Sequence, residues 1–133
     1  MLAILDRMVR DASDLQKLGV GIAAISSNDV ISYPEDSFDN MKKLAAKHNF
    51  TFPYMYDETQ EVAKLYNAVC TPDFFGFNEN NELQYRGRLE ESKMEIIPNA
   101  KKELLEAMIQ VSETGSGPND QIPSIGCSIK WKE

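Results

Sequence analysis

The residues of this chain that most suggest chemistry are a cysteine and a proline separated by one threonine. Cys70, Thr71 and Pro72 follow a helix-like segment and precede an apolar run at 73–77 that is typical of a buried strand. Proline fixes its own φ and has no backbone donor, so at the mouth of a strand it leaves a neighbouring backbone group free to meet a ligand. The plain alternative is a trans proline beside an inert cysteine, since free cysteine is among the most buried residue types.

The composition is that of one soluble globular domain. The chain has 133 residues, of which 42% are apolar, and we expect a single domain over residues 1–133 with a C-terminal tail at 115–133. A net charge of −7, from 21 acidic and 14 basic residues, argues against nucleic acid or an anionic membrane as partner. No run is apolar enough to span a bilayer, and Asp6, Arg7 and Arg10 are incompatible with a signal peptide. Two cysteines are too few for a disulfide scaffold, so the expected compartment is a reducing cytoplasm.

The spacing of apolar residues predicts alternating helices and strands. Helices are predicted near 2–18, 34–48, 61–67 and 100–114, and strands near 20–25, 52–56, 73–77 and 83–88. Asp57 and Gln60 have the spacing of a capping box at the start of the third helix. The polar turn at 78–81 joins the last two strands into a hairpin. This order is typical of an α/β protein with a mostly parallel sheet and one antiparallel edge hairpin.

Five short strings occur in an order that resembles a known family. They are Ala24–Asp29, Phe52–Asp57, Cys70–Phe75, Tyr85–Leu89 and Ile125–Trp131. Together they resemble the peroxiredoxin-like branch of the alkyl hydroperoxide reductase and thiol-specific antioxidant (AhpC/TSA) family, over essentially the whole chain. The resemblance implies a thioredoxin-like three-layer fold and an antioxidant oxidoreductase activity on a thiol or disulfide protein or a peroxide.

The resemblance also implies roles for particular residues. Pro72 would be a cis-proline facing the reactive thiol, Thr71 would offer its backbone to an extended substrate, and Arg86 would contact substrate. Arg86 and its neighbour Arg88 could stabilise a thiolate or a peroxide, although a solvated edge strand explains both equally well. Cys70 is the candidate catalytic cysteine, since it could resolve a mixed disulfide and any residual activity should depend on it, although filling space is the interpretation we favour.

Two further residues are weaker candidates. Cys127, in the tail, is a candidate redox partner of Cys70, but a disulfide needs Cα atoms within about 7 Å, and the sequence does not give that distance. His48 has no potential metal ligands near it in the sequence, so we expect no metal ion. No glycine-rich phosphate loop is present, so we expect no organic cofactor.

One feature of the family pattern is missing from this sequence. The family carries a Cys-x-x-Cys motif at the N-terminus of the first helix, directly after a central strand, and the helix end lowers the pKa of the first thiol. Residues 1–7 resemble the body of that helix, so the motif and the strand have no counterpart here. We therefore expect an N-terminally incomplete fold, which a shortened natural start or an incomplete chain would explain equally well.

Two functional hypotheses follow. The first is a redox enzyme that turns over thiols or peroxides slowly or not at all, because no cysteine occupies the activating position. The second is a non-catalytic thioredoxin-fold module that binds a partner through the cleft beside Pro72; neither involves nucleic acid or a membrane. Strands 20–25 and 73–77 would flank the missing central strand, so they must pair directly or be covered by a second chain. We expect a homodimer, formed by strand exchange.

Overall fold

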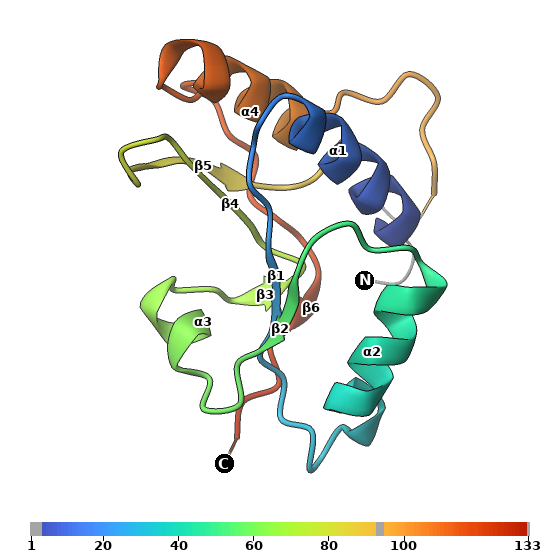
Figure 1. The fold of residues 1–133 in the computed structure, drawn as a ribbon. Coiled ribbons are helices and arrows are strands. Elements are labelled where there is room, and N and C mark those ends of the chain that lie inside the picture. Colours follow the sequence, from blue (N-terminus) through green and yellow to red (C-terminus); the bar gives the residue numbers. More distant parts are fainter. Residues whose placement is uncertain (1–3, 93–94, 133) are drawn as a thin grey trace.

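The computed structural model describes residues 4–92 and 95–132, in which helices and strands alternate (Figure 1). The first half contains α1 (Leu5–Lys17), β1 (Ala24–Ser26), the 3₁₀ helix η2 (Pro34–Asp36), α2 (Phe38–Lys47), β2 (Tyr54–Tyr56) and α3 (Glu61–Leu65). The second half contains β3 (Cys70–Thr71), β4 (Phe74–Phe77), β5 (Leu83–Gly87), α4 (Glu103–Thr114) and β6 (Cys127–Ser128). No helix in the described residues is long and apolar enough to cross a membrane.

The helices begin and end close to where the sequence predicts, with local chemistry setting the details. The second helix was predicted to begin at Pro34, but Pro34 opens only η2. Ser37 caps α2 instead, because its hydroxyl accepts the Asn40 N–H at 3.3 Å. Gly115, with φ of 80°, ends α4 in a conformation that glycine adopts without strain.

The strands form three separate pairs rather than one mostly parallel sheet. β1 and β2 are parallel, β4 and β5 form the predicted antiparallel hairpin, and β3 pairs antiparallel with β6. Within the described residues β1 and β4 do not pair with each other, so direct pairing, one of the two arrangements that the sequence leaves open for these strands, does not occur. The predicted strand at 20–25 is also wrong in its bounds, because only Ala24–Ser26 has a ladder partner.

The hydrophobic core lies between the helices α1 and α4 and one face of the β4–β5 hairpin. Leu15, Tyr85, Ala107, Met108 and Val111 form its centre, and α1 and α4 lie side by side over it (Figure 1). Burial raises the pKa of Tyr85 to about 12, and its hydroxyl donates to the Arg88 carbonyl, so it stays a neutral phenol. Gly76 packs against Met108 on this face, and a Cβ at this position would require the Met108 sulfur to move.

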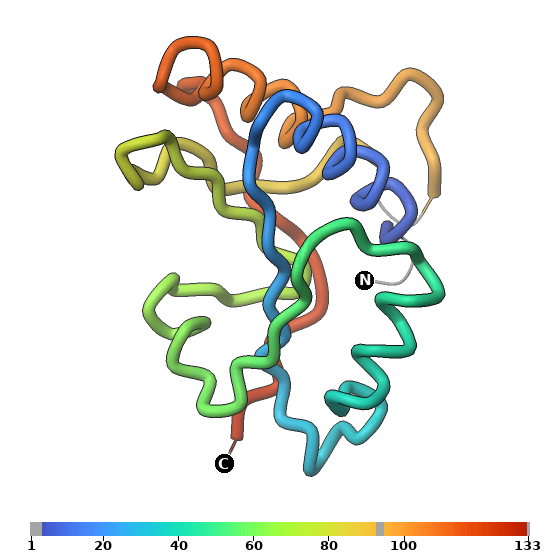
Figure 2. Tube along the Cα trace, viewed as in Figure 1, coloured from blue at the N-terminus to red at the C-terminus, as the bar shows by residue number. Residues whose placement is uncertain are grey.

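The C-terminal strap, residues 119–132, runs across all three strand pairs (Figure 2). It first follows β5, where the Arg86 N–H donates to the Gln121 Oε1 at 2.9 Å and the Arg88 N–H to the Ile122 carbonyl at 2.9 Å. Further along, its residues Cys127–Ser128 form β6, which pairs with β3, and the strap ends beside the carboxyl ends of β1 and β2. The sequence shows this segment only as a polar tail, because its partners are backbone groups far away along the chain.

Candidate functional site

The Thr71–Pro72 step lies at the junction of β3 and β4. Its peptide bond is cis, which confirms the sequence-based expectation. Asn67, with φ of 56°, ends the turn after α3 and directs the chain towards this step. The step therefore joins two short strands that belong to different strand pairs.

The backbone of Thr71 is paired with the chain's own strap. Thr71 and Cys127 are register partners across β3 and β6, and the Ile129 N–H donates to the Val69 carbonyl at 3.4 Å one step further along. Gly126 crosses so close that a Cβ at this position would collide with the Thr71 carbonyl. The edge that the sequence predicts for an extended substrate is thus already occupied by residues of this chain.

Cys70 is held as a thiol. Its Sγ donates towards the Pro72 carbonyl at 3.6 Å and the Ser124 carbonyl at 3.7 Å. Burial raises the pKa of the Cys70 thiol, the Asp73 carboxylate raises it further, and Arg86 offsets only part of this. A thiolate is the reactive form of cysteine, so these surroundings argue against Cys70 as a nucleophile.

Cys127 lies close to Cys70 but points away from it. Directly paired residues share one face of an antiparallel pair, and successive residues point to opposite faces. Thr71 and Cys127 are paired, as are Cys70 and Ser128, so the two thiols lie on opposite faces. Both cysteines are free, and Cys127 is exposed whereas Cys70 is partly buried. A disulfide between them would require the strand pair to rearrange.

Arg86 contacts the two ends of the loop that contains Thr71 and Pro72. The Arg86 Nη2 donates to the Asn67 carbonyl at 2.7 Å and to the Asp73 Oδ2 at 3.2 Å. The guanidinium also stacks 4.9 Å from the centre of the Phe75 ring. Its neighbour Arg88 donates to the Glu103 Oε1 at 3.0 and 2.6 Å. Both arginines therefore have partners in this chain, and Arg86 is placed to position the loop.

Gln60 links the end of the strap to the carboxyl ends of β1 and β2. Its Nε2 donates to the carbonyls of Ser27, at 2.7 Å, and Lys130, at 2.9 Å, and its Oε1 accepts the Lys132 N–H at 3.0 Å. The predicted capping box does not form, because α3 begins at Glu61 with Gln60 at its N-cap position and Asp57 lies before the helix. The Asp57 carboxylate still accepts the Val62 and Ala63 N–H groups, while the Gln60 side chain binds the strap.

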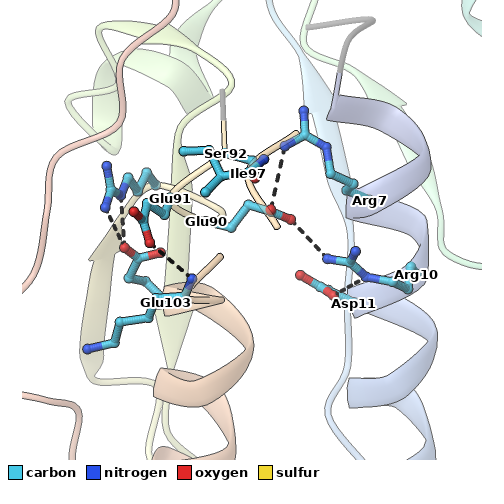
Figure 3. A network of polar contacts seen from close by, with 10 residues as sticks. Arg7, Arg10, Asp11, Glu90, Glu91, Ser92, Ile97 and Glu103 are labelled. Carbon is cyan, nitrogen blue, oxygen red and sulfur yellow. Dashed lines mark hydrogen bonds and ion pairs between the residues drawn. The ribbon is translucent and has the colours of Figure 1, made fainter. Parts of the chain in front are cut away.

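A buried polar network, which the sequence does not reveal, joins α1 to the segment after β5 (Figure 3). Arg10 donates to Glu90 at 2.9 Å and to Asp11 at 2.8 Å, and Arg7 lies 3.5 Å from the other Glu90 oxygen. Burial alone would raise the pKa of Glu90, but Arg10, Ser92 and Arg7 outweigh this and hold it below its usual value. Arg7 and Arg10 appear in the sequence only as surface-type charges, since Glu90 is 80 residues away from Arg10.

Comparison with known proteins gives this arrangement a context. The model of the AhpC/TSA family matches residues 3–86. An uncharacterized conserved protein from Geobacillus kaustophilus, whose structure is solved, shares 48% sequence identity with this chain, and the two structures superpose with a TM-score of 0.90. The match covers 97% of this chain and 69% of that chain. A hypothetical protein from Sinorhizobium meliloti 1021 is 32% identical with a TM-score of 0.89, and that match covers 98% of this chain and 72% of the other. No curated protein matches the chain.

Proposed function

Because the chain belongs to the AhpC/TSA family and has a thioredoxin-like α/β fold, we propose that it is a redox protein acting on thiol–disulfide partners or peroxides at the Thr71–Pro72 step. One observation carries the proposal beyond the family. The β3–β6 pair holds both cysteines of the chain at this step, with the exposed Cys127 opposite Thr71. Two free thiols beside the same loop are the groups that thiol chemistry requires.

The proposed chemistry is ordinary thiol–disulfide exchange. The Cys127 thiolate forms a bond to one sulfur of a partner's disulfide, and the other sulfur leaves as a thiolate, so that a mixed disulfide results. With a peroxide, the thiolate takes one oxygen to become a sulfenic acid, and the second oxygen leaves as water or an alcohol. Cys127 is the better candidate for both reactions, because Cys70 is partly buried and its pKa is raised.

We further propose that the chain alone performs this chemistry slowly. A free cysteine at a pKa of about 8.5 is only a few per cent ionised at neutral pH. Strong activation comes from a helix N-terminus or a cationic neighbour, and Cys70 and Cys127 lie in the strands β3 and β6. A reducing compartment such as the cytoplasm would suit two free thiols.

The test measures the reduction of hydrogen peroxide and of a small aromatic disulfide between pH 6 and 10, with glutathione as the reductant that returns Cys127 to its thiol after each cycle and with the rate without protein subtracted. The chain is compared with Cys70→Ser, Cys127→Ser and the double variant. We expect slow turnover that rises with pH, is lost in Cys127→Ser and is retained in Cys70→Ser. Turnover that survives in the double variant would contradict the proposal, and turnover abolished by Cys70→Ser alone would assign the chemistry to the other thiol.

A second candidate function is a non-catalytic binding module. The observation that favours it is the state of Cys70, whose thiol is bonded to two carbonyls and disfavoured as an anion. In that case the Thr71–Pro72 loop, fixed by Arg86, would serve as a rigid surface for a protein partner. A partner that binds the Cys70→Ser, Cys127→Ser double variant as well as the parent chain would favour this function.

A further inference from the structure

A cavity of about 190 Å³ lies between α2 and the segment at 50–54 that leads into β2. From α2 it is lined by Phe38, Met41, Lys42 and Ala45, which stand at the i, i+3, i+4 and i+7 positions of one helix face. None of the residues that line it belongs to the Thr71–Pro72 step. What the cavity binds is therefore a separate question from the redox chemistry proposed above.

The wall opposite α2 is aromatic. The centre of the Phe50 ring lies 4.8 Å from that of Phe52 and 5.3 Å from that of Tyr54. Phe38 adds a fourth ring from α2, and Met41 adds a thioether. Rings pack favourably against other rings in offset or edge-on contacts, and a thioether also packs well on a ring. This lining therefore suits an aromatic ligand.

Backbone hydrogen bonds fix both ends of the aromatic wall. At its start, the Phe50 N–H donates to the Ala45 carbonyl of α2 at 3.0 Å. At its end, the Ala24 N–H of β1 donates to the Pro53 carbonyl at 2.9 Å. The segment between these bonds cannot close onto α2 without breaking one of them. The cavity is thus preformed, and a ligand that enters it has little protein ordering to offset.

Exposure separates the floor of the cavity from its rim. Met41 and Phe52 are 4% and 7% exposed and form the floor, whereas Phe38 is 47% exposed. The Lys42 side chain is also largely exposed, and its Nζ lies 4.6 Å from the centre of the Phe38 ring. Asp39 lies 4.0 Å from this ammonium, at the outer limit of an ion pair. Lys42 therefore keeps the capacity to bind an anion at the rim.

The volume of the cavity fits one aromatic ring. A cavity of about 150 Å³ lined by apolar side chains is large enough to bind benzene, and this one measures about 190 Å³. It has room for one ring and a short substituent. With the ring against the floor, the substituent reaches the rim, where the Lys42 ammonium attracts a carboxylate and repels an amine.

We propose that this cavity binds a single-ring aromatic carboxylate, with its ring between α2 and Phe50 and its carboxylate at Lys42. A ligand this small binds with a dissociation constant on the order of 0.1–1 mM. The net charge of −7 does not favour anions in general. The preference for a carboxylate must therefore come from Lys42 itself.

Titration with phenylacetate, benzyl alcohol and benzylamine tests the proposal, because these probes share one ring and differ in charge. With methionine methyl groups labelled for NMR, phenylacetate should shift the Met41 methyl resonance and leave that of Met108, in the core beside α4, unchanged. Phenylacetate should bind at least about threefold more tightly than benzylamine, as is typical of a partly exposed ion pair.

Two pairs of matched variants locate the ring and the charge. Ala45→Leu fills the cavity and should weaken phenylacetate binding at least about tenfold, because the ring loses its place. Ala46→Leu is its control, because Ala46 is exposed and does not line the cavity. Lys42→Gln should abolish the preference for phenylacetate over benzyl alcohol, whereas Lys43→Gln, one residue further along, should keep it. Urea unfolding of each variant checks that the fold is kept.

Four results would overturn the proposal. The first is no Met41 shift with phenylacetate at about 10 mM, well above the expected dissociation constant. The second is a Met108 shift as large as that of Met41, and the third is equal weakening by Ala45→Leu and Ala46→Leu. The fourth is benzylamine binding as tightly as phenylacetate, which would leave the cavity without the proposed selectivity.

Discussion

At the scale of single residues, the surroundings of the two thiols differ although they are neighbours in one strand pair. Cys70 donates to two carbonyl oxygens and faces Asp73, and all of these favour the neutral thiol. Cys127 is turned to the other face and exposed. The family resemblance draws attention to Cys70 because of its proximity to Pro72, but proximity in sequence does not determine ionisation.

This difference predicts a clear order of thiol reactivity. Alkylation by iodoacetamide at pH 7.5 should be at least several times slower for Cys70, measured in Cys127→Ser, than for Cys127, measured in Cys70→Ser. Burial and the raised pKa both slow Cys70. Mass spectrometry over time gives the two rates, with the denatured variants as the control in which the rates converge. Equal rates in the folded variants would show that Cys70 is not protected.

Glu90 gives a second residue-scale prediction, about pH. The pKa of Glu90 is lowered in the folded chain. Its ion pairs therefore stabilise the fold fully above the pKa of unfolded glutamate, about 4.3. This stabilisation disappears as the pH falls through the lower pKa of the folded state. Removing one partner of a buried pair costs about 3 kcal/mol or more. Glu90→Gln should therefore lower the free energy of unfolding by about that amount at pH 7, and the difference should shrink as the pH falls towards 3. Urea unfolding at several pH values measures this; a difference that stays constant with pH would exclude the carboxylate as its cause.

At the scale of elements, the sequence predicts what is local and misses what is long-range. The helices α1, α2 and α4 follow from apolar spacing, and the hairpin follows from its polar turn. β6 is missed because two exposed residues, Cys127 and Ser128, have no strand-like pattern and pair with residues nearly 60 positions away. At the site, the cis bond before Pro72 follows from the family resemblance. The opposed directions of the thiols depend on the β3–β6 register, and the sequence carries no signal for that register.

The close packing of the β3–β6 pair leads us to predict that a larger residue in place of Gly126 destabilises the fold. A Cβ at this position meets the Thr71 carbonyl, a backbone atom that cannot move without breaking the strand pair. Gly126→Ala should destabilise the chain by about 1–3 kcal/mol, the usual cost of overpacking. Gly21→Ala is the control, because nothing lies within 4 Å of its Cβ position. Urea unfolding compares the two, and equal midpoints would show that the strap does not press against Thr71 in solution.

At the scale of the whole molecule, the strap connects parts that otherwise share little. The three strand pairs have no ladder between them in the described residues. The strap bonds to β5 through Gln121 and Ile122, pairs with β3, and reaches β1 and β2 through Lys130, whose carbonyl accepts the Asp29 N–H at 2.7 Å. It also covers the outer edge of β5, which protects an otherwise open strand edge. Cooperative unfolding of this chain should therefore depend on the strap.

Two isoleucines of the strap provide the sharpest test of that dependence. Ile129 is 7% exposed and lies between β6 and the Lys130 anchor, whereas Ile125 is 71% exposed although it is only four residues away. Ile129→Ala should lower the free energy of unfolding by about 2–4 kcal/mol, because it removes buried methyl groups and leaves a cavity. Ile125→Ala should change it by no more than about 0.5 kcal/mol.

Hydrogen exchange tests whether the strap holds the strand pairs together. If it does, Ile129→Ala should lower protection in β1 and β2 as well as in β3 and β6, because the Lys130 bonds at the end of the strap loosen with it. Loss of protection confined to β6 would mean that the strap merely lies on the surface, and that the strand pairs are held together by the helices that cover them.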